Sequence, residues 1–170
     1  MEVQQVTKNG ILAVIAALAL PTLSMAQDDM IVTGPHQGAV TGNISGNFTS
    51  VSGSDSSTFS ITGSYFFTDV FEGLAGLTYV RVSGSDSTGF SLGGNYYFMR
   101  NVSDPKMHPY LGVRWVRFDS GGGDADGFAG ALGLHYFIRP NISFTPELQI
   151  GELEDEGFTT LQFGLTMWFR

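Results

Sequence analysis

Three side chains that can carry charge or proton chemistry lie in the second half of the chain. Arg114 and Glu147 have opposite charges, and His135 lies between them in sequence. Each belongs to a segment in which polar and apolar residues alternate. If the polar sides of these segments enclose a narrow interior, the charges must be paired, because an unpaired buried charge is costly. The group is then either a gate or proton-linked site, or a structural ion pair that fills the interior.

Acidic side chains gather in the turn-rich stretches between the alternating segments. Four such stretches hold nine acids and no base: Asp55; Asp86; Asp119, Asp124 and Asp126; and Glu152, Glu154, Asp155 and Glu156. Acidic tips keep loops hydrated and discourage association. The stretch "DSGGGDADG" (119–127) lacks the ligand spacing and the closing Glu of a calcium-binding loop, so it predicts a surface turn.

The elements that must position these groups are β-strands. Residues 51–67, "VSGSDSSTFSITGSYFF", are nearly repeated at 82–98, "VSGSDSTGFSLGGNYYF", with 11 of the 17 positions identical. In both copies apolar or aromatic residues alternate with small polar ones, which is the period of a strand. The repeat therefore indicates one loop and one strand used twice, because antiparallel barrels are built from equivalent hairpins.

Eight segments show this alternation, and turn-rich stretches separate them at regular spacing. They cover residues 39–50, 57–67, 73–83, 88–99, 109–119, 127–138, 142–151 and 158–169. A tilted transmembrane strand needs roughly 9–11 residues, and the segments have about that length. Pro146 falls inside the seventh segment, where it cannot donate to a ladder, so we expect a bulge there.

Aromatic residues and the polar faces distinguish a membrane barrel from a soluble one. The second, fourth and sixth segments each open with Phe and close with Phe or Tyr, and two aromatic belts are completed by Tyr110, Trp115, Phe118, Trp168 and Phe169. Such residues collect where hydrocarbon meets water. The polar faces carry Ser, Thr, Asn, Gly and Gln with hardly a Lys or Glu, which suits a crowded interior. The sequence predicts an all-β fold, an eight-stranded antiparallel up-and-down transmembrane β-barrel.

The first 26 residues have the pattern of a cleavable signal peptide. A polar start, an apolar run at 11–20 and a small-residue site at 24–26 fit this pattern, and ten apolar residues are too few to span a bilayer as a helix. We therefore expect a signal peptide at 1–26, a short tail at 27–37 and the barrel at 38–170. The chain has no cysteine and a net charge of −8, so neither disulfides nor nucleic-acid binding are expected.

Two stretches resemble the small eight-stranded outer-membrane barrels of Gram-negative bacteria, the OmpA-type transmembrane domain and OmpX-like proteins. They are "PYLGVRW" (109–115), which is similar to a strand start in that family, and the terminal "LQFGLTMWFR" (161–170). The resemblance implies a multi-pass protein of the cell outer membrane, reached after Sec-type export, with the tail at 27–37 in the periplasm. It also implies that the barrel assembly machinery reads the last strand through Phe169, which Arg170 follows here.

The histidines do not indicate an enzyme. Lipid A deacylases, which are outer-membrane barrels of similar size, use a His-x-Ser pair on one strand. None of His36, His108 and His135 has Ser two residues further on. We therefore expect no enzymatic activity, no cofactor and no protein-held metal.

The expected function is that of an outer-membrane barrel with a largely occluded polar lumen and a structural or surface-interaction role. The inner residues Phe66, Tyr97 and Trp168 argue for occlusion, as does a pair between Arg114 and Glu147, because eight strands leave an interior just wide enough for side chains. A narrow channel for ions or small solutes is the alternative. A lipid-modifying enzyme is a third, less favoured interpretation.

Arg81 and Arg117 are expected to face lipopolysaccharide. Each ends an ascending segment on its outward side, in "LTYVR" (77–81) and "VRWVR" (113–117). Their stems can lie along apolar surface while the planar guanidinium binds phosphate oxygens bidentately. If the tail is periplasmic and the strands alternate up and down, the acidic stretches lie at the outer end. Their acidic outer rim, Asp119, Asp124, Asp126, Glu152, Glu154, Asp155 and Glu156, would then recruit divalent cations shared with the same phosphates. Outer-membrane lipid and lipopolysaccharide are the expected partners.

Overall fold

The computed structural model describes residues 34–51, 54–82, 85–98, 106–119, 123–154 and 156–169. For residues 48–51, 54 and 55 it describes the backbone alone. The expected signal peptide at 1–26, most of the tail at 27–37, and Asp155 and Arg170 lie outside the described residues. Within the described part, no helix is long and apolar enough to cross a membrane.

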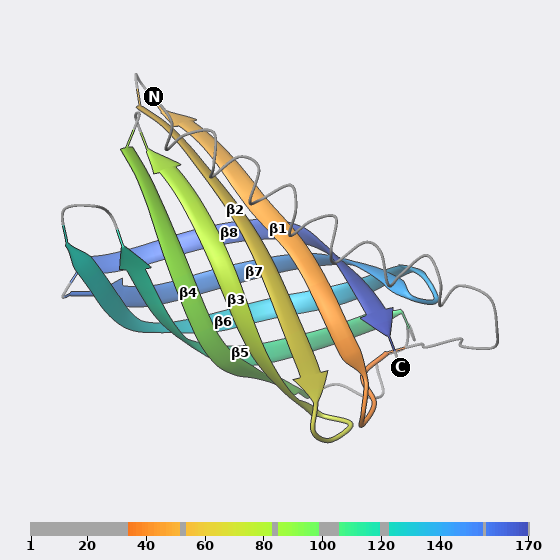
Figure 1. Ribbon diagram of the computed structural model, residues 1–170. Helices are drawn as coiled ribbons and strands as arrows, with labels where there is room; N and C mark the ends of the chain where they lie inside the picture. Colours follow the sequence, from red (N-terminus) through yellow and green to blue (C-terminus); the bar gives the residue numbers. More distant parts are fainter. Residues whose placement is uncertain are drawn as a thin grey trace, which may run out of the picture. The chain divides into compact units, whose positions relative to one another are not determined.

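Eight antiparallel strands form a closed barrel in which each strand pairs with its sequence neighbours and the last pairs with the first (Figure 1). The strands are β1 (Val40–Val51), β2 (Ser54–Phe66), β3 (Phe71–Val82), β4 (Ser85–Tyr97), β5 (Met107–Asp119), β6 (Asp124–Arg139), β7 (Ile142–Leu153) and β8 (Glu156–Phe169). The predicted eight-stranded antiparallel barrel is confirmed, and its strand ends lie within three residues of the expected ones. Six of the eight strands start two or three residues earlier than the expected segments, because backbone pairing continues into the hairpins whatever the side chains are.

The outside of the barrel is apolar along every strand. Large apolar side chains stand exposed on the outward positions, for example Leu77, Val113 and Phe128, which are 60%, 61% and 66% exposed. Small polar residues alternate with them and face the lumen, as Ser60 and Thr166 do. A monomer in water rarely exposes so much contiguous apolar surface. The polarity is the inverse of a soluble barrel and matches a wall that faces hydrocarbon.

The aromatic belts are smaller than expected. Tyr110 and Trp168 are each 2% exposed and point into the barrel, and Phe118 lines the lumen. Their assignment to the outer belts was therefore wrong, and Trp168 takes the inner position that was also expected for it. Tyr110, Phe118 and Trp168 share the parity of the inward polar residues on their own strands, and strand geometry fixes the face by parity, not by side-chain type.

Pro146 interrupts the ladder between β6 and β7 but does not form the expected bulge. Pairing stops at Gly133↔Glu147 and resumes in the same register at Tyr136↔Phe144. The register shift lies further on, between Phe137 and Arg139. The prediction of a bulge at Pro146 was wrong, because a missing N–H can be accommodated by losing a ladder bond without adding a residue. On its other side Pro146 stays in register with Phe163 of β8.

Candidate functional site

An aromatic cluster lies at one end of the lumen, the end where β1 starts and β8 ends. It consists of Ala39, Phe66, Tyr97, Tyr110, Phe137 and Trp168, all at most 5% exposed. The ring centroids of neighbours in this aromatic plug are 5.1–5.4 Å apart. Tilted contacts at this spacing are favourable for aromatic rings. The plug is therefore a tightly packed cluster of rings at this end of the lumen.

Gly133 lets the plug form, because the ring of Tyr110 lies directly against its backbone. A Cβ added at Gly133 would overlap the Tyr110 ring. The ring in turn places the Tyr110 hydroxyl 2.7 Å from Glu147. The glycine thus provides the space for a large side chain from the neighbouring strand.

Replacing Gly133 with alanine is expected to destabilise the barrel by about 1–3 kcal/mol, because the Tyr110 ring must leave its position. Gly130 lies on the same strand and is the matched control, since a Cβ there would meet nothing closer than the Ile150 carbonyl at 3.8 Å. Urea unfolding in lipid vesicles measures both variants. Equal stability of the two variants would contradict the role of the Tyr110 contact.

The structure brings two of the three sequence-predicted lumen residues together above the plug. The Arg114 guanidinium lies 2.9 Å from the Glu147 carboxylate, and their side chains are 5% and 14% exposed. Glu147 also accepts hydrogen bonds from Tyr110 and, at 2.6 Å, from Gln149. Arg114 donates further to the carbonyls of Gly94 and Val113. The pair is thus held from several strands, and whether it acts as a gate or only as a structural element stays a prediction.

His135 faces the lumen but does not join the ion pair. Its Nδ1 lies 3.0 Å from the hydroxyls of both Ser143 and Thr145, and its ring packs among Tyr97, Tyr110 and Trp168. The reason is register, since Glu147 is opposite Gly133 and His135 is one inward step closer to the plug. A histidine beside a serine hydroxyl resembles a base and its nucleophile. However, Ser143 is 0% exposed, so no substrate can reach it in this conformation.

Glu72 is a buried lumen carboxylate that the sequence analysis missed. It is 3% exposed and accepts hydrogen bonds from Thr41, Ser64, Asn95 and Tyr97, of which the last two are 2.7 Å long. All four donors are neutral. The signal was available, because the inward parity of β3 extends back to position 72, which had been read as part of a turn.

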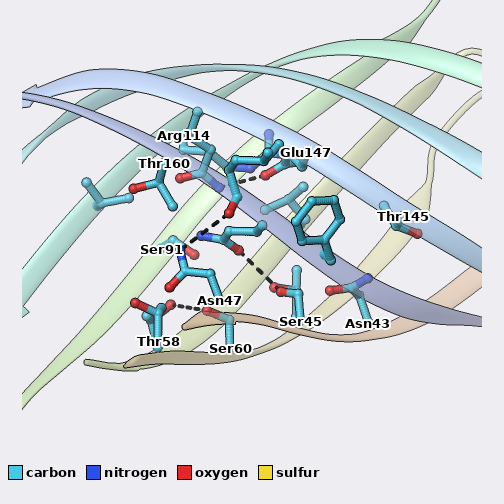
Figure 2. Close-up of a pocket in the computed structure, with 18 of the residues that line it drawn as sticks. Asn43, Ser45, Asn47, Thr58, Ser60, Ser91, Arg114, Thr145, Glu147 and Thr160 are labelled. Atoms are coloured by element: carbon cyan, nitrogen blue, oxygen red, sulfur yellow. Dashed lines mark hydrogen bonds and ion pairs between the residues drawn. The ribbon is translucent and has the colours of Figure 1, made fainter. Parts of the chain in front are cut away.

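A cavity of about 750 Å³ occupies the lumen beyond the plug. Figure 2 shows hydroxyl and amide side chains of its wall, among them Asn43, Ser45, Asn47 and Thr58, with Arg114 and Glu147 across from them. The lumen therefore holds the aromatic plug at one end and a cavity beyond it. Two factors keep it hollow: its wall consists mostly of short side chains, and large inward residues such as Arg114 lie flat over glycines.

The outer-rim arginines have partners within the chain. Arg81 lies 3.7 Å from Asp86, and the Arg117 guanidinium contacts Asp124. All four side chains are about half exposed or more. Two of the nine acids are therefore neutralised by outward bases on neighbouring strands, which a count of loop charges did not capture.

Comparison with known proteins identifies the fold. No protein-family model matches the chain, and no relative is found among curated proteins. Similar solved structures include the N-terminal β-barrel domain of Pseudomonas aeruginosa OprF, with 15% identity and a TM-score of 0.64 over 78% of this chain and 98% of that one. Neisserial surface protein A has 17% identity and a TM-score of 0.57 over 77% of this chain and 96% of its own. The outer membrane protein OprG from Pseudomonas aeruginosa has 15% identity and a TM-score of 0.53 over 82% of this chain and 99% of its own. At these identities the likeness shows the fold, that of small outer-membrane barrels.

Proposed function

We propose that this chain is an integral outer-membrane barrel that does not conduct and has a structural or surface-interaction role. The observation that supports the proposal is the aromatic plug, which packs inside the lumen at the end near the termini of the barrel. The apolar outer wall and the polar lumen support a membrane location. In the proposed orientation the plug faces the periplasm and the cavity faces outward. Phe169, paired with Val40 at the closing strand, is the residue proposed to be read by the assembly machinery.

Cell-envelope fractionation and planar-bilayer recording test the two halves of this proposal. We expect the protein in the outer membrane, with an electrophoretic mobility that shifts on heating as a folded barrel unfolds. In a planar bilayer we expect no stable single-channel steps. Recovery in the soluble periplasmic fraction would refute the location, and regular steps would refute the closed lumen.

A narrow channel for ions or small solutes is the second candidate, and the cavity is the observation that favours it. The cavity has a volume of about 750 Å³, and the plug and the Arg114–Glu147 pair would have to move for conduction. Steps that disappear when Arg114 is replaced would support this function over the first.

Lipopolysaccharide is the proposed partner of the outer rim. Arg81 and Arg117 face outward near the end of the apolar wall, where lipid phosphates would lie. Among the described residues, no three acidic or histidine side chains are close enough to hold a metal ion by themselves. In this proposal the phosphates therefore complete the coordination of any divalent cation at the rim.

Neutralising the hairpin between β7 and β8 is expected to remove a calcium-dependent stabilisation. The variant replaces Glu152, Glu154, Asp155 and Glu156 with Gln or Asn, and thermal unfolding is followed in lipopolysaccharide with and without calcium. The same measurement in phosphatidylcholine is the control, because that lipid offers no net phosphate charge to bridge. If calcium stabilises the variant as much as the original chain, the acids serve only to hydrate the loops.

A further inference from the structure

The ladder between β1 and β8 that closes the barrel stops before the end of the barrel that lies away from the plug. It runs from Val40↔Phe169 to Gly46↔Phe163, which makes seven pairs. Within the described residues, each of the other seven ladders has ten or more. Both strands continue beyond the last pair, β1 to Val51 and β8 back to Glu156. Residues 47–51 of β1 and 156–162 of β8 therefore face each other without a ladder, at the end of the barrel that lies away from the plug.

Side chains replace backbone pairing at the point where this ladder ends. The Asn47 side-chain amide donates to the Leu161 carbonyl at 3.4 Å, and the Ser45 hydroxyl donates to the Gln162 amide oxygen at 3.3 Å. The Trp168 N–H donates to the carbonyl of Asn141, which precedes β7. In β8 the backbone N–H and C=O groups of even-numbered residues are therefore directed toward β7, and those of odd-numbered residues toward β1. The backbone of Thr159 is therefore directed toward a strand that no longer pairs with it.

Outward residues of β8 line the cavity at this same place. The described residues that line it are on inward positions of their strands, with three exceptions: Thr159, Leu161 and Phe163 of β8. Leu161 and Phe163 are also 50% and 48% exposed. Beside the upper half of the β1–β8 seam, the same residues of β8 thus belong both to the cavity lining and to the exposed apolar surface.

The height of the gap places it near the outer boundary of the hydrocarbon. Seven tilted pairs rise roughly 18 Å, whereas the apolar band of such barrels is roughly 25 Å tall. Unpaired backbone at membrane depth is tolerated only where it lines protein or a water-filled cavity. The unpaired edge of β8 meets this condition because Thr159 lines the cavity.

We propose that the upper β1–β8 seam is a lateral port through which the polar head of a membrane amphiphile enters the lumen. The ligand class is a lipid with a hydroxyl-rich head and an alkyl or acyl chain. Its head would hydrogen-bond to the Ser, Thr, Asn and Gln side chains of the cavity wall, while its chain stays outside against Ile44, Leu161 and Phe163. The inference rests on the proposed membrane location and does not depend on whether the barrel conducts.

Cross-linking the seam tests the port. The chain has no cysteine, so the pair Asn47→Cys and Gln162→Cys, next in register after Gly46↔Phe163, is unique. The control pair is Asn43→Cys and Thr166→Cys, which lies on the paired part of the same seam. A short bis-methanethiosulfonate linker bridges either pair if the sulfurs do not oxidise directly. The full chain is placed in phosphatidylcholine nanodiscs, with dodecyl maltoside as the probe and maltose as its chainless counterpart.

The readout is the nuclear Overhauser contact between sugar protons and amides of the lumen, such as those of Ser45 and Gln149. With dodecyl maltoside we expect these contacts in the original chain and in the control pair, their loss when the upper seam is bridged, and their return on reduction. Maltose contacts, which arise through the open end of the cavity, are expected not to change. Maltoside contacts that persist in the bridged seam, or are absent from the original chain, would overturn the port. Envelope fractionation decides the membrane location independently.

Discussion

Replacing Glu147 alone with leucine is expected to destabilise the barrel by about 3–5 kcal/mol, because it leaves the buried Arg114 guanidinium without its carboxylate. The double variant Arg114→Met with Glu147→Leu removes both charges at similar volume. It is expected to recover most of that loss, since a buried ion pair contributes little over an apolar pair of the same size. The free energy of unfolding in urea, measured in lipid vesicles, gives both values.

The exposed pair of Arg117 and Asp124 provides the matched control for this experiment. Asp124→Asn also removes one carboxylate from an arginine, but at a site where water replaces the lost partner. It is expected to leave stability unchanged. If the double variant at Arg114 and Glu147 is as unstable as Glu147→Leu, the lost energy comes from packing and not from an uncompensated charge.

Opening the aromatic plug is expected to turn a silent barrel into a conducting one. Phe66 and Phe137 lie on either side of Trp168, with ring centroids 5.4 and 5.1 Å from it. Replacing both with alanine removes two apolar rings from the closed end and connects the cavity to the other side of the membrane. We expect single-channel steps in a planar bilayer that prefer cations, because Glu72 and Glu147 outnumber Arg114 in the layer above.

The control for the plug variant replaces the outward neighbours of the same two residues, Phe67 and Ile138, with alanine. Both side chains are more than half exposed and lie outside the lumen. This variant is expected to remain silent, and heat-dependent mobility confirms that each barrel is folded. A silent plug variant that still folds would mean that the charged layer closes the lumen by itself.

Strand period made the fold predictable from the sequence. Alternation with period two assigns each residue to one face without knowledge of its neighbours, and it placed Arg114 and Glu147 on the inner face and Leu77 on the outer one. The same rule would have found Glu72 and would have kept Tyr110 and Trp168 out of the outer belts. Those errors came from ranking residue type above parity.

The register between neighbouring strands decided which inward side chains meet, which the alternation along each strand could not predict. How far one strand is shifted along the next decides whether Arg114 reaches Glu147 and why His135 packs against the plug instead. It also decides where the β1–β8 ladder ends. That shift is fixed when the barrel closes between residues more than a hundred positions apart, such as Val40 and Phe169. The sequence by itself determined the eight strands and their two faces, because both follow from local backbone geometry. The plug, the cavity and the lateral seam were decided by tertiary structure, because they arise only where side chains of distant strands meet at one height.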